Sequence, residues 1–318
     1  MKAIMYHYVR PNSSHMPWLR YLRLEDFCKQ LDFFNDRYKL LGREEFLESV
    51  RSSRPCDEGV VLTFDDGLSD HFLYVLPELV KRRLWGIFYI PTSPLRHPKT
   101  LLQVHRIHAL IGALGGGRVL RELIPLLSSE DLAFEHVQEF RHLTYSRQEN
   151  DQATNMVKRI LNYFVSPTQQ EILLNTLMDR FFDESVLAEK WYMNVPQLCS
   201  LRDSGMLIGS HTVKHQVMSK LTGDEQTKEI LNSFQALEEE LGEQNIRTFS
   251  YPYGGFHTFD ALTEAALSQS GCLFSFNVEM RDISKEDLKK RPQALPRYDC
   301  NQFPNGAAAP ISPPNGDS

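Results

Sequence analysis

The fold of this chain is decided by the stretch VVLTFDDG at residues 60–67. Its first five residues are almost all β-branched or aromatic, which is typical of a strand that is covered on both faces. Asp65 and Asp66 follow at once, and Gly67 lets the backbone turn away. In parallel α/β folds active sites lie at such carboxyl ends of strands. Asp and Gly after a strand are also ordinary turn residues, so this stretch alone leaves both interpretations open.

Strands and amphipathic helices alternate on both sides of this stretch, which predicts βα units that feed a mostly parallel sheet or barrel. Apolar residues recur at helical spacing from Leu24 to Phe34, directly after a first apolar run. We expect strands at residues 2–6, 60–64, 85–90, 206–209, 247–251 and 272–276, and helices at 43–50, 71–83, 195–204, 223–241 and 259–269.

The pattern changes between residues 94 and 190, where strand-like runs disappear. Helical patterns at 101–114, 152–164 and 167–182 replace them, which indicates a helical insertion. Because the strands before and after this segment end at the same edge of the sheet, we expect the insertion near the rim of any site there.

Composition and charge exclude several classes of protein. The chain has 318 residues, 42% of them hydrophobic, and a formal net charge of -6, so it can bury a large core and is a poor match for nucleic acid or an anionic membrane. It has no apolar run long enough to span a bilayer, and its first residues, MKAIMYHYVRP, lack the features of an export signal. The five cysteines, which contain no CxxC pair, predict free thiols in a cytoplasmic protein.

Two histidines follow the predicted strand that ends LIGS. His211 and His215 stand four residues apart in HTVKH, and on a helical turn this spacing places both imidazoles on one side, where they can bind one metal ion. Asp66 is available as a third ligand, which leaves open positions as in hydrolytic zinc centres. Zinc is the first candidate, while iron, cobalt, nickel and manganese suit the same donors. A pair of solvated or core histidines is the alternative.

Two further groups stand at predicted strand ends. SYPYGG at residues 250–255 places the Tyr253 N–H where it can stabilise an oxyanion, although the motif by itself is only a turn. His7 ends the first predicted strand.

Together these elements resemble the polysaccharide deacetylase family, the NodB-homology group of carbohydrate esterase family 4. The resemblance rests on TFDDG, HTVKH and SYPYG, in this order, over residues 1–94 and 195–303. IMYHYV at residues 4–9 and LPRYD at 295–299 are similar to a subgroup that carries a histidine acid on its first strand. The resemblance implies a distorted, incomplete (β/α)7 barrel of the NodB type, an α/β fold, over 1–94 and 195–303. A helical insertion at 95–194 would cover the substrate site, and 304–318 would form a disordered tail.

The resemblance also implies a role for each matched residue. Asp66, His211 and His215 would bind one divalent metal, and Asp65 would be the general base. His7 would be the general acid, and Tyr253 would donate its backbone N–H to the oxyanion. Where many members have an arginine that orients the base, this chain has Ser250. Arg297 is the candidate replacement, and a surface ion pair is its alternative.

The substrate implied is an N-acylated amino sugar carried on a nucleotide, a lipid or a glycan, with an acetyl or formyl group removed during synthesis of a surface polysaccharide or lipopolysaccharide. Arg96, His105 and Arg106 at the start of the insertion are candidates for substrate binding, or else form a solvated helix face. Three other functions stay open: an O-acetyl esterase or cyclic-amide hydrolase of the same fold, a non-catalytic glycan-binding module, and a helical interaction protein.

Overall fold

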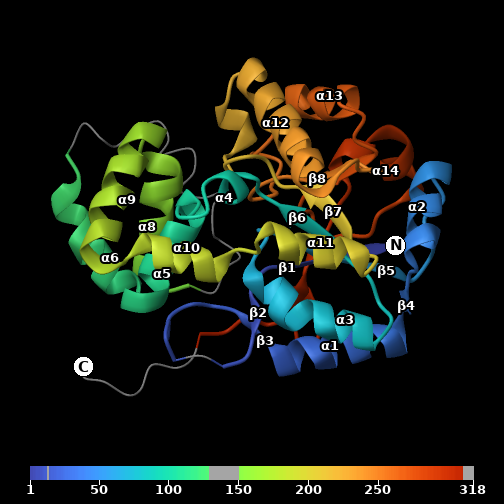
Figure 1. Cartoon of the computed structure of the whole chain (residues 1–318), viewed down its shortest axis with the longest axis horizontal. Helices are drawn as coiled ribbons and strands as arrows, with labels where there is room; N and C mark the ends of the chain where they lie inside the picture. Colours follow the sequence, from blue (N-terminus) through green and yellow to red (C-terminus); the bar gives the residue numbers. More distant parts are fainter. Residues whose placement is uncertain (13, 129–149, 311–318) are drawn as a thin grey trace. The chain divides into compact units, whose positions relative to one another are not determined.

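The computed structural model describes residues 1–12, 14–128 and 150–310. They form two compact units, and the first contains residues 1–11, 21–98 and 190–308. A parallel sheet in the order β10-β1-β5-β6-β7-β8-β9 runs through this unit (Figure 1). Its strands are β1 Lys2–Tyr6, β4 Lys39–Leu40, β5 Gly59–Phe64, β6 Ile87–Ile90, β7 Leu207–Ser210, β8 Thr248–Ser250, β9 Phe274–Phe276 and β10 Tyr298–Asp299, with β4 paired to β5.

Helices surround this sheet, as the predicted βα alternation requires (Figure 1). A bridge between Phe276 and Leu295 curls the sheet toward closure at its β9 edge, so the strands form an incomplete parallel barrel. β2 Val9–Arg10 and β3 Leu22–Arg23 make a separate two-stranded sheet. The helices are α1 Leu24–Arg37, α2 Arg43–Ser52, η1 His71–Val75, α3 Leu76–Lys81, α4 Ser93–Arg96, α11 Val195–Asp203, η4 Met218–Lys220, α12 Gly223–Leu241, α13 Ala261–Gln269, α14 Lys285–Lys290, η5 Pro292–Ala294 and η6 Cys300–Gln302.

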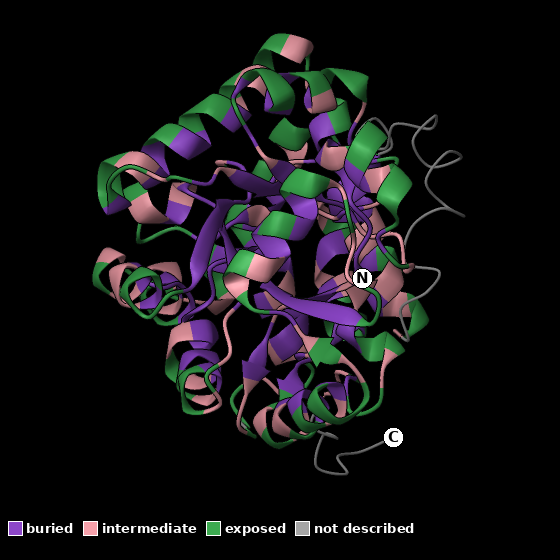
Figure 2. Cartoon of the chain, turned by 90° about the vertical axis from the view of Figure 1, so that its right-hand side faces the viewer, coloured by how far each residue is buried: buried purple, intermediate pink, exposed green. Residues whose placement is uncertain are grey.

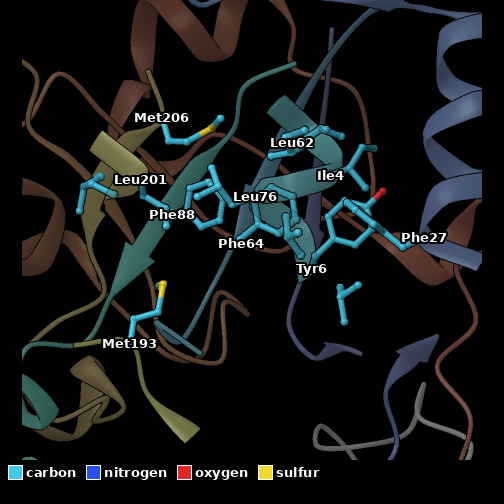
Figure 3. Close-up of a cluster of buried hydrophobic side chains, with 14 of the residues drawn as sticks. Ile4, Tyr6, Phe27, Leu62, Phe64, Leu76, Phe88, Met193, Leu201 and Met206 are labelled. Atoms are coloured by element: carbon cyan, nitrogen blue, oxygen red, sulfur yellow. The ribbon is translucent and has the colours of Figure 1, made fainter. Parts of the chain in front are cut away.

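Apolar side chains on the two faces of the strands hold the barrel together. Figure 2 shows the strands buried along their length, while the helices carry exposed outer faces. Between the sheet and the helices, Phe64 stacks on Tyr6 and on Phe88, with ring centroids 5.2 and 4.7 Å apart. This cluster extends to Phe27 of α1 and Leu201 of α11 (Figure 3). The rigid strands therefore fix the positions of the residues that follow them.

The second unit contains, among the described residues, 12, 14–20, 99–128, 150–189 and 309–310. Its helices are α5 Gln103–Leu114, α6 Gly116–Leu123, η2 Ile124–Leu126, α8 Gln152–Arg159, η3 Ile160–Phe164, α9 Pro167–Phe181 and most of α10 Glu184–Trp191. The segment that precedes β3 joins this unit, since the Trp18 N–H donates to the Gly112 carbonyl at 2.9 Å. The helical segment of this unit, 99–189, begins and ends a few residues inside the expected insertion, 95–194. That the insertion covers the substrate site stays a prediction.

The structure differs from the expected elements in two helices and in the C-terminal segment. The predicted helix at 71–83 begins as the π-helical turn η1 before α3 continues it, and the predicted helix at 152–164 ends in the π-helical turn η3. The expected tail starts too early: the Gln30 side chain donates to the Pro304 carbonyl at 3.0 Å, and the Gly306 N–H donates to Phe303 at 3.1 Å. Residues 311–318 of that predicted tail lie outside the described residues.

All five cysteines are free, as the sequence predicted. No helix in the described ranges is long and apolar enough to cross a membrane.

Candidate metal and hydrolytic site

Three side chains at the carboxyl edge of the sheet form a compact donor cluster. Asp66 follows β5 and His211 follows β7, and His215 lies four residues further on. Each offers a ligand atom within 4.8 Å of the others, and all three residues are buried. Asp66 Oδ1 lies 3.5 Å from His211 Nε2 and 3.4 Å from His215 Nε2. In the described part of the chain no other group of three such residues is close enough to hold a metal ion.

The histidine motif is not a helical turn, so that expectation is wrong. Residues 211–217 form a loop in which Thr212 and His215 have positive φ angles of 65° and 57°. The His215 N–H donates to Thr212 Oγ1 at 2.8 Å, which closes the loop on itself. The two imidazoles still meet, with ring centroids 4.7 Å apart. A strained loop therefore achieves what the four-residue spacing suggested a helix would do.

The hydrogen bond of His211 suits a metal ligand. Its Nδ1 lies 2.7 Å from the Ser250 carbonyl oxygen, and because a carbonyl only accepts, Nδ1 must carry the proton. Nε2 then keeps its lone pair directed at the cluster, the arrangement by which second partners orient metal-binding histidines. Burial lowers the pKa of His211, but the Asp65 and Asp66 carboxylates outweigh it and the pKa is raised. The two carboxylates thus favour a positive charge beside Nε2, which either a proton or a metal ion can supply. Two imidazoles and one carboxylate thus fit a divalent cation such as zinc.

Asp65 lies beside the cluster but is held by a different residue. Arg297 binds both of its carboxylate oxygens, at 2.8 and 2.7 Å, and both side chains are buried. The same guanidinium donates to Thr63 Oγ1 and to Ser250 Oγ. The structure therefore brings Arg297 to the position expected of it, and a surface ion pair is excluded because Arg297 is 0% exposed.

This pairing keeps Asp65 ionised. Burial raises the pKa of Asp65, but the charges of Arg297 and His211 outweigh it, and the pKa falls from 3.8 to about 2. Asp65 lies 4.0 Å from His211 Nε2, with its oxygens taken up by Arg297. It is therefore an ionised carboxylate next to the cluster.

The lowered pKa of Asp65 predicts an acid dependence of stability. The carboxylate stabilises the fold above pH 3.8, and this contribution is lost as the pH falls toward about 2, a loss of about 2 kcal/mol. Urea unfolding in a chelator between pH 5 and 2 should therefore show a steeper fall in the free energy of unfolding for the parent than for Asp65→Asn. Equal slopes would contradict the assigned pairing.

His7 approaches the cluster from β1. Its Nε2 lies 3.9 Å from Asp66 Oδ2, and 38% of its side chain is exposed, so it borders both the donors and solvent. His71 of η1 holds the backbone there, since its Nε2 lies 2.8 Å from the His7 carbonyl oxygen. Burial lowers the pKa of His71 to about 4, so it is neutral and donates this bond. The sequence carried no signal for this contact, because His71 reads as one residue of a helical pattern.

Tyr253 lies at the edge of the site with a positive φ of 63°. Its ring packs against His215, with centroids 5.0 Å apart. The next residue, Gly254, also has a positive φ, and a Cβ there would lie 2.3 Å from Val278, so the turn needs glycine. The tyrosine is therefore next to the cluster, and the role of its N–H as an oxyanion donor stays a prediction.

The three predicted substrate-binding residues differ in their surroundings. Arg96 pairs with Glu239 of α12. Arg106 is 7% exposed and binds both oxygens of Glu184 at 2.8 Å. His105 is fully buried. Arg106 is therefore paired within the second unit, and substrate binding by the three residues stays a prediction.

Comparisons with known proteins agree with this geometry. The family model for polysaccharide deacetylase matches residues 181–272, a segment that contains His211, His215 and Tyr253. No curated protein matches the chain in sequence. The fold, however, is similar to those of several solved deacetylase structures.

Streptococcus pyogenes deacetylase PplD in complex with acetate has a TM-score of 0.57 at 15% identity, covering 94% of this chain and 91% of that one. IcaB from Ammonifex degensii has a TM-score of 0.54 at 16% identity, covering 94% and 90%. A de-N-acetylase from Aggregatibacter actinomycetemcomitans has a TM-score of 0.51 at 13% identity, covering 93% of each chain.

The resemblance to the polysaccharide deacetylase family is thereby confirmed, by a matched segment that carries two of the three donors and by the fold. The predicted α/β fold, a distorted, incomplete (β/α)7 barrel of the NodB type, is confirmed as well.

Proposed function

We propose that this chain is a metal-dependent hydrolase that removes an N-acyl group, acetyl or formyl, from an amino sugar. The observation that carries the proposal is the pair of adjacent carboxylates with separate environments. Asp66 faces two histidines in a donor cluster, whereas Asp65 is held ionised by Arg297. A metal ligand beside an independent base is what metal-assisted hydrolysis of an amide uses.

The chain's own residues then divide the reaction between them. When bound, a divalent cation would polarise the substrate carbonyl and activate water. Asp65 accepts the proton of the attacking water, and Arg297 and Ser250 keep its carboxylate in place. The Tyr253 N–H stabilises the oxyanion. His7, which borders solvent, donates a proton to the leaving amine.

The proposed substrate is an N-acylated amino sugar on a nucleotide, a lipid or a glycan, used in cytoplasmic steps of surface polysaccharide or lipopolysaccharide synthesis. The similar structures support the deacetylase class, since they include a deacetylase and a de-N-acetylase. The acyl group is a question for a panel of N-formyl, N-acetyl and O-acetyl sugars. Hydrolysis of the O-acetyl sugar alone would favour the esterase alternative, and absence of metal binding would favour the glycan-binding module.

Loss of a metal ligand should abolish both metal binding and activity. His211→Ala removes the imidazole that faces Asp66. Loss of a residue that only hydrogen-bonds a metal ligand lowers metal affinity up to ~100-fold, so loss of the ligand itself should lower it by at least this factor. Amide hydrolysis should be lost as well. Metal content after dialysis and release of acetate or formate measure the two effects. His108→Ala, in the second unit, is the control and should retain both. An active, metal-free His211→Ala would refute the metal site.

A further inference from the structure

The loop that carries both histidine ligands is held by a carboxylate that contacts neither of them. Glu229 lies in α12. Its Oε2 accepts the Val213 N–H at 2.9 Å and the Lys214 N–H at 3.0 Å. Both bonds therefore go to one oxygen atom of one side chain.

The opposite side of the loop is tied to the end of β6. The Thr92 N–H donates to the Thr212 carbonyl at 3.1 Å, and the Ser93 N–H donates to the Val213 carbonyl at 2.8 Å. The peptide groups between the two ligands are thus held from two directions, by β6 and by Glu229. The Thr212 N–H donates to Ser210 Oγ of β7 at 3.2 Å, so Glu229 is the acceptor that holds the next two N–H groups, those of Val213 and Lys214.

These contacts matter because the loop is strained. Thr212 and His215 both have positive φ angles, and residues held in sparsely populated backbone regions cost about 1–3 kcal/mol each. Thr212 is β-branched, for which this conformation is a genuine outlier. Such a conformation persists only where surrounding bonds determine it. Relaxation of the loop would move the His215 imidazole away from Asp66, since its own backbone is one of the strained positions.

We propose that Glu229 is a positioning residue for the metal site, holding the 211–215 loop in the conformation that places both imidazoles on one cation. The inference rests on the proposed function, because it assumes that the cluster binds metal. For this role the side chain at position 229 needs an oxygen that accepts the Val213 and Lys214 N–H groups. Glutamine can supply it, while alanine cannot.

The test is titration of Co²⁺ into the metal-free protein, followed by calorimetry and by the visible absorption of the bound ion. Glu229→Ala should weaken Co²⁺ binding about 10–100-fold, as loss of an outer partner does at other sites, and should alter the absorption spectrum. Glu229→Gln should bind within about threefold of the parent, since it keeps the acceptor. Glu240→Ala, at an exposed position of the same helix, is the matched control and should bind as the parent does.

The outcomes separate the inference from the proposed function. A folded Glu229→Ala protein that binds Co²⁺ as tightly as the parent overturns the positioning role. Equal weakening in Glu229→Gln also overturns it, because charge would then matter in place of the acceptor. If Glu229→Ala does not fold, Glu229→Asp withdraws the oxygen by one methylene and must show the same weakening. A parent that binds no Co²⁺ refutes the proposed metal site itself.

Discussion

Asp65→Asn is expected to lower turnover about 10³-fold while metal binding is retained. The amide keeps the size of the side chain but cannot take a proton from water, and general-base catalysis contributes about 10²–10⁴-fold. Metal binding should persist because the donor cluster consists of Asp66, His211 and His215. Metal content and release of acetate or formate from an N-acylated glucosamine measure the two properties.

The neighbouring residue supplies the matched control for this prediction. Asp66→Asn changes the same chemical group one position along the chain, but it weakens a metal ligand, so it should lose metal as well as activity. Thermal unfolding of both variants shows whether they remain folded. An active Asp65→Asn enzyme would remove Asp65 from the role of base, and a metal-free one would place it among the ligands.

Arg297→Met is expected to lower the free energy of unfolding by about 3–5 kcal/mol. Methionine keeps most of the apolar stem, but it leaves Asp65 buried without its countercharge, and breaking a buried ion pair costs about this much. The pKa of Asp65 should rise in consequence, since Arg297 is the charge that most lowers it. Urea unfolding at pH 7 in the presence of a chelator measures the loss.

An exposed arginine provides the comparison. Arg291 also binds both oxygens of a glutamate, Glu264, but its side chain is 44% exposed, so Arg291→Met should cost less than about 1 kcal/mol. The double variant Asp65→Asn with Arg297→Met should recover part of the stability lost in Arg297→Met, since no unpaired charge remains. Equal losses for the two arginine variants would contradict the buried pairing.

From the sequence, site residues could be predicted only where they directly follow a strand. Asp65 and Asp66 were found because a continuous apolar strand precedes them, and His211 because it follows a second one. The prediction of a helical turn between His211 and His215 is wrong. The spacing of two residues does not indicate a loop whose backbone is hydrogen-bonded to Glu229, Thr92 and Ser93. Local pattern carries no information about such distant hydrogen bonds.

Arg106 illustrates the opposite error. Its place among other basic residues predicted either substrate contact or a solvated helix face, yet it is bound by Glu184, 78 positions along the chain. The sequence around a charged residue in a helix is the same whether the side chain is solvated or pairs with a distant carboxylate. Only the packing of α5 with α9 and α10 distinguishes the two.

By itself the sequence determined the βα alternation, the strand that ends in two carboxylates and the three motifs at strand ends, because apolar periodicity and turn residues act locally. The tertiary structure decided the contacts themselves, with Asp66 against the two histidines and Asp65 bound at both oxygens by a fully buried Arg297. It does so because the parallel register of β1 with β5 and β10 brings residues 65 and 297, 232 positions apart, within hydrogen-bonding distance. The separate contacts of Asp65 and Asp66 are thus a property of the assembled barrel.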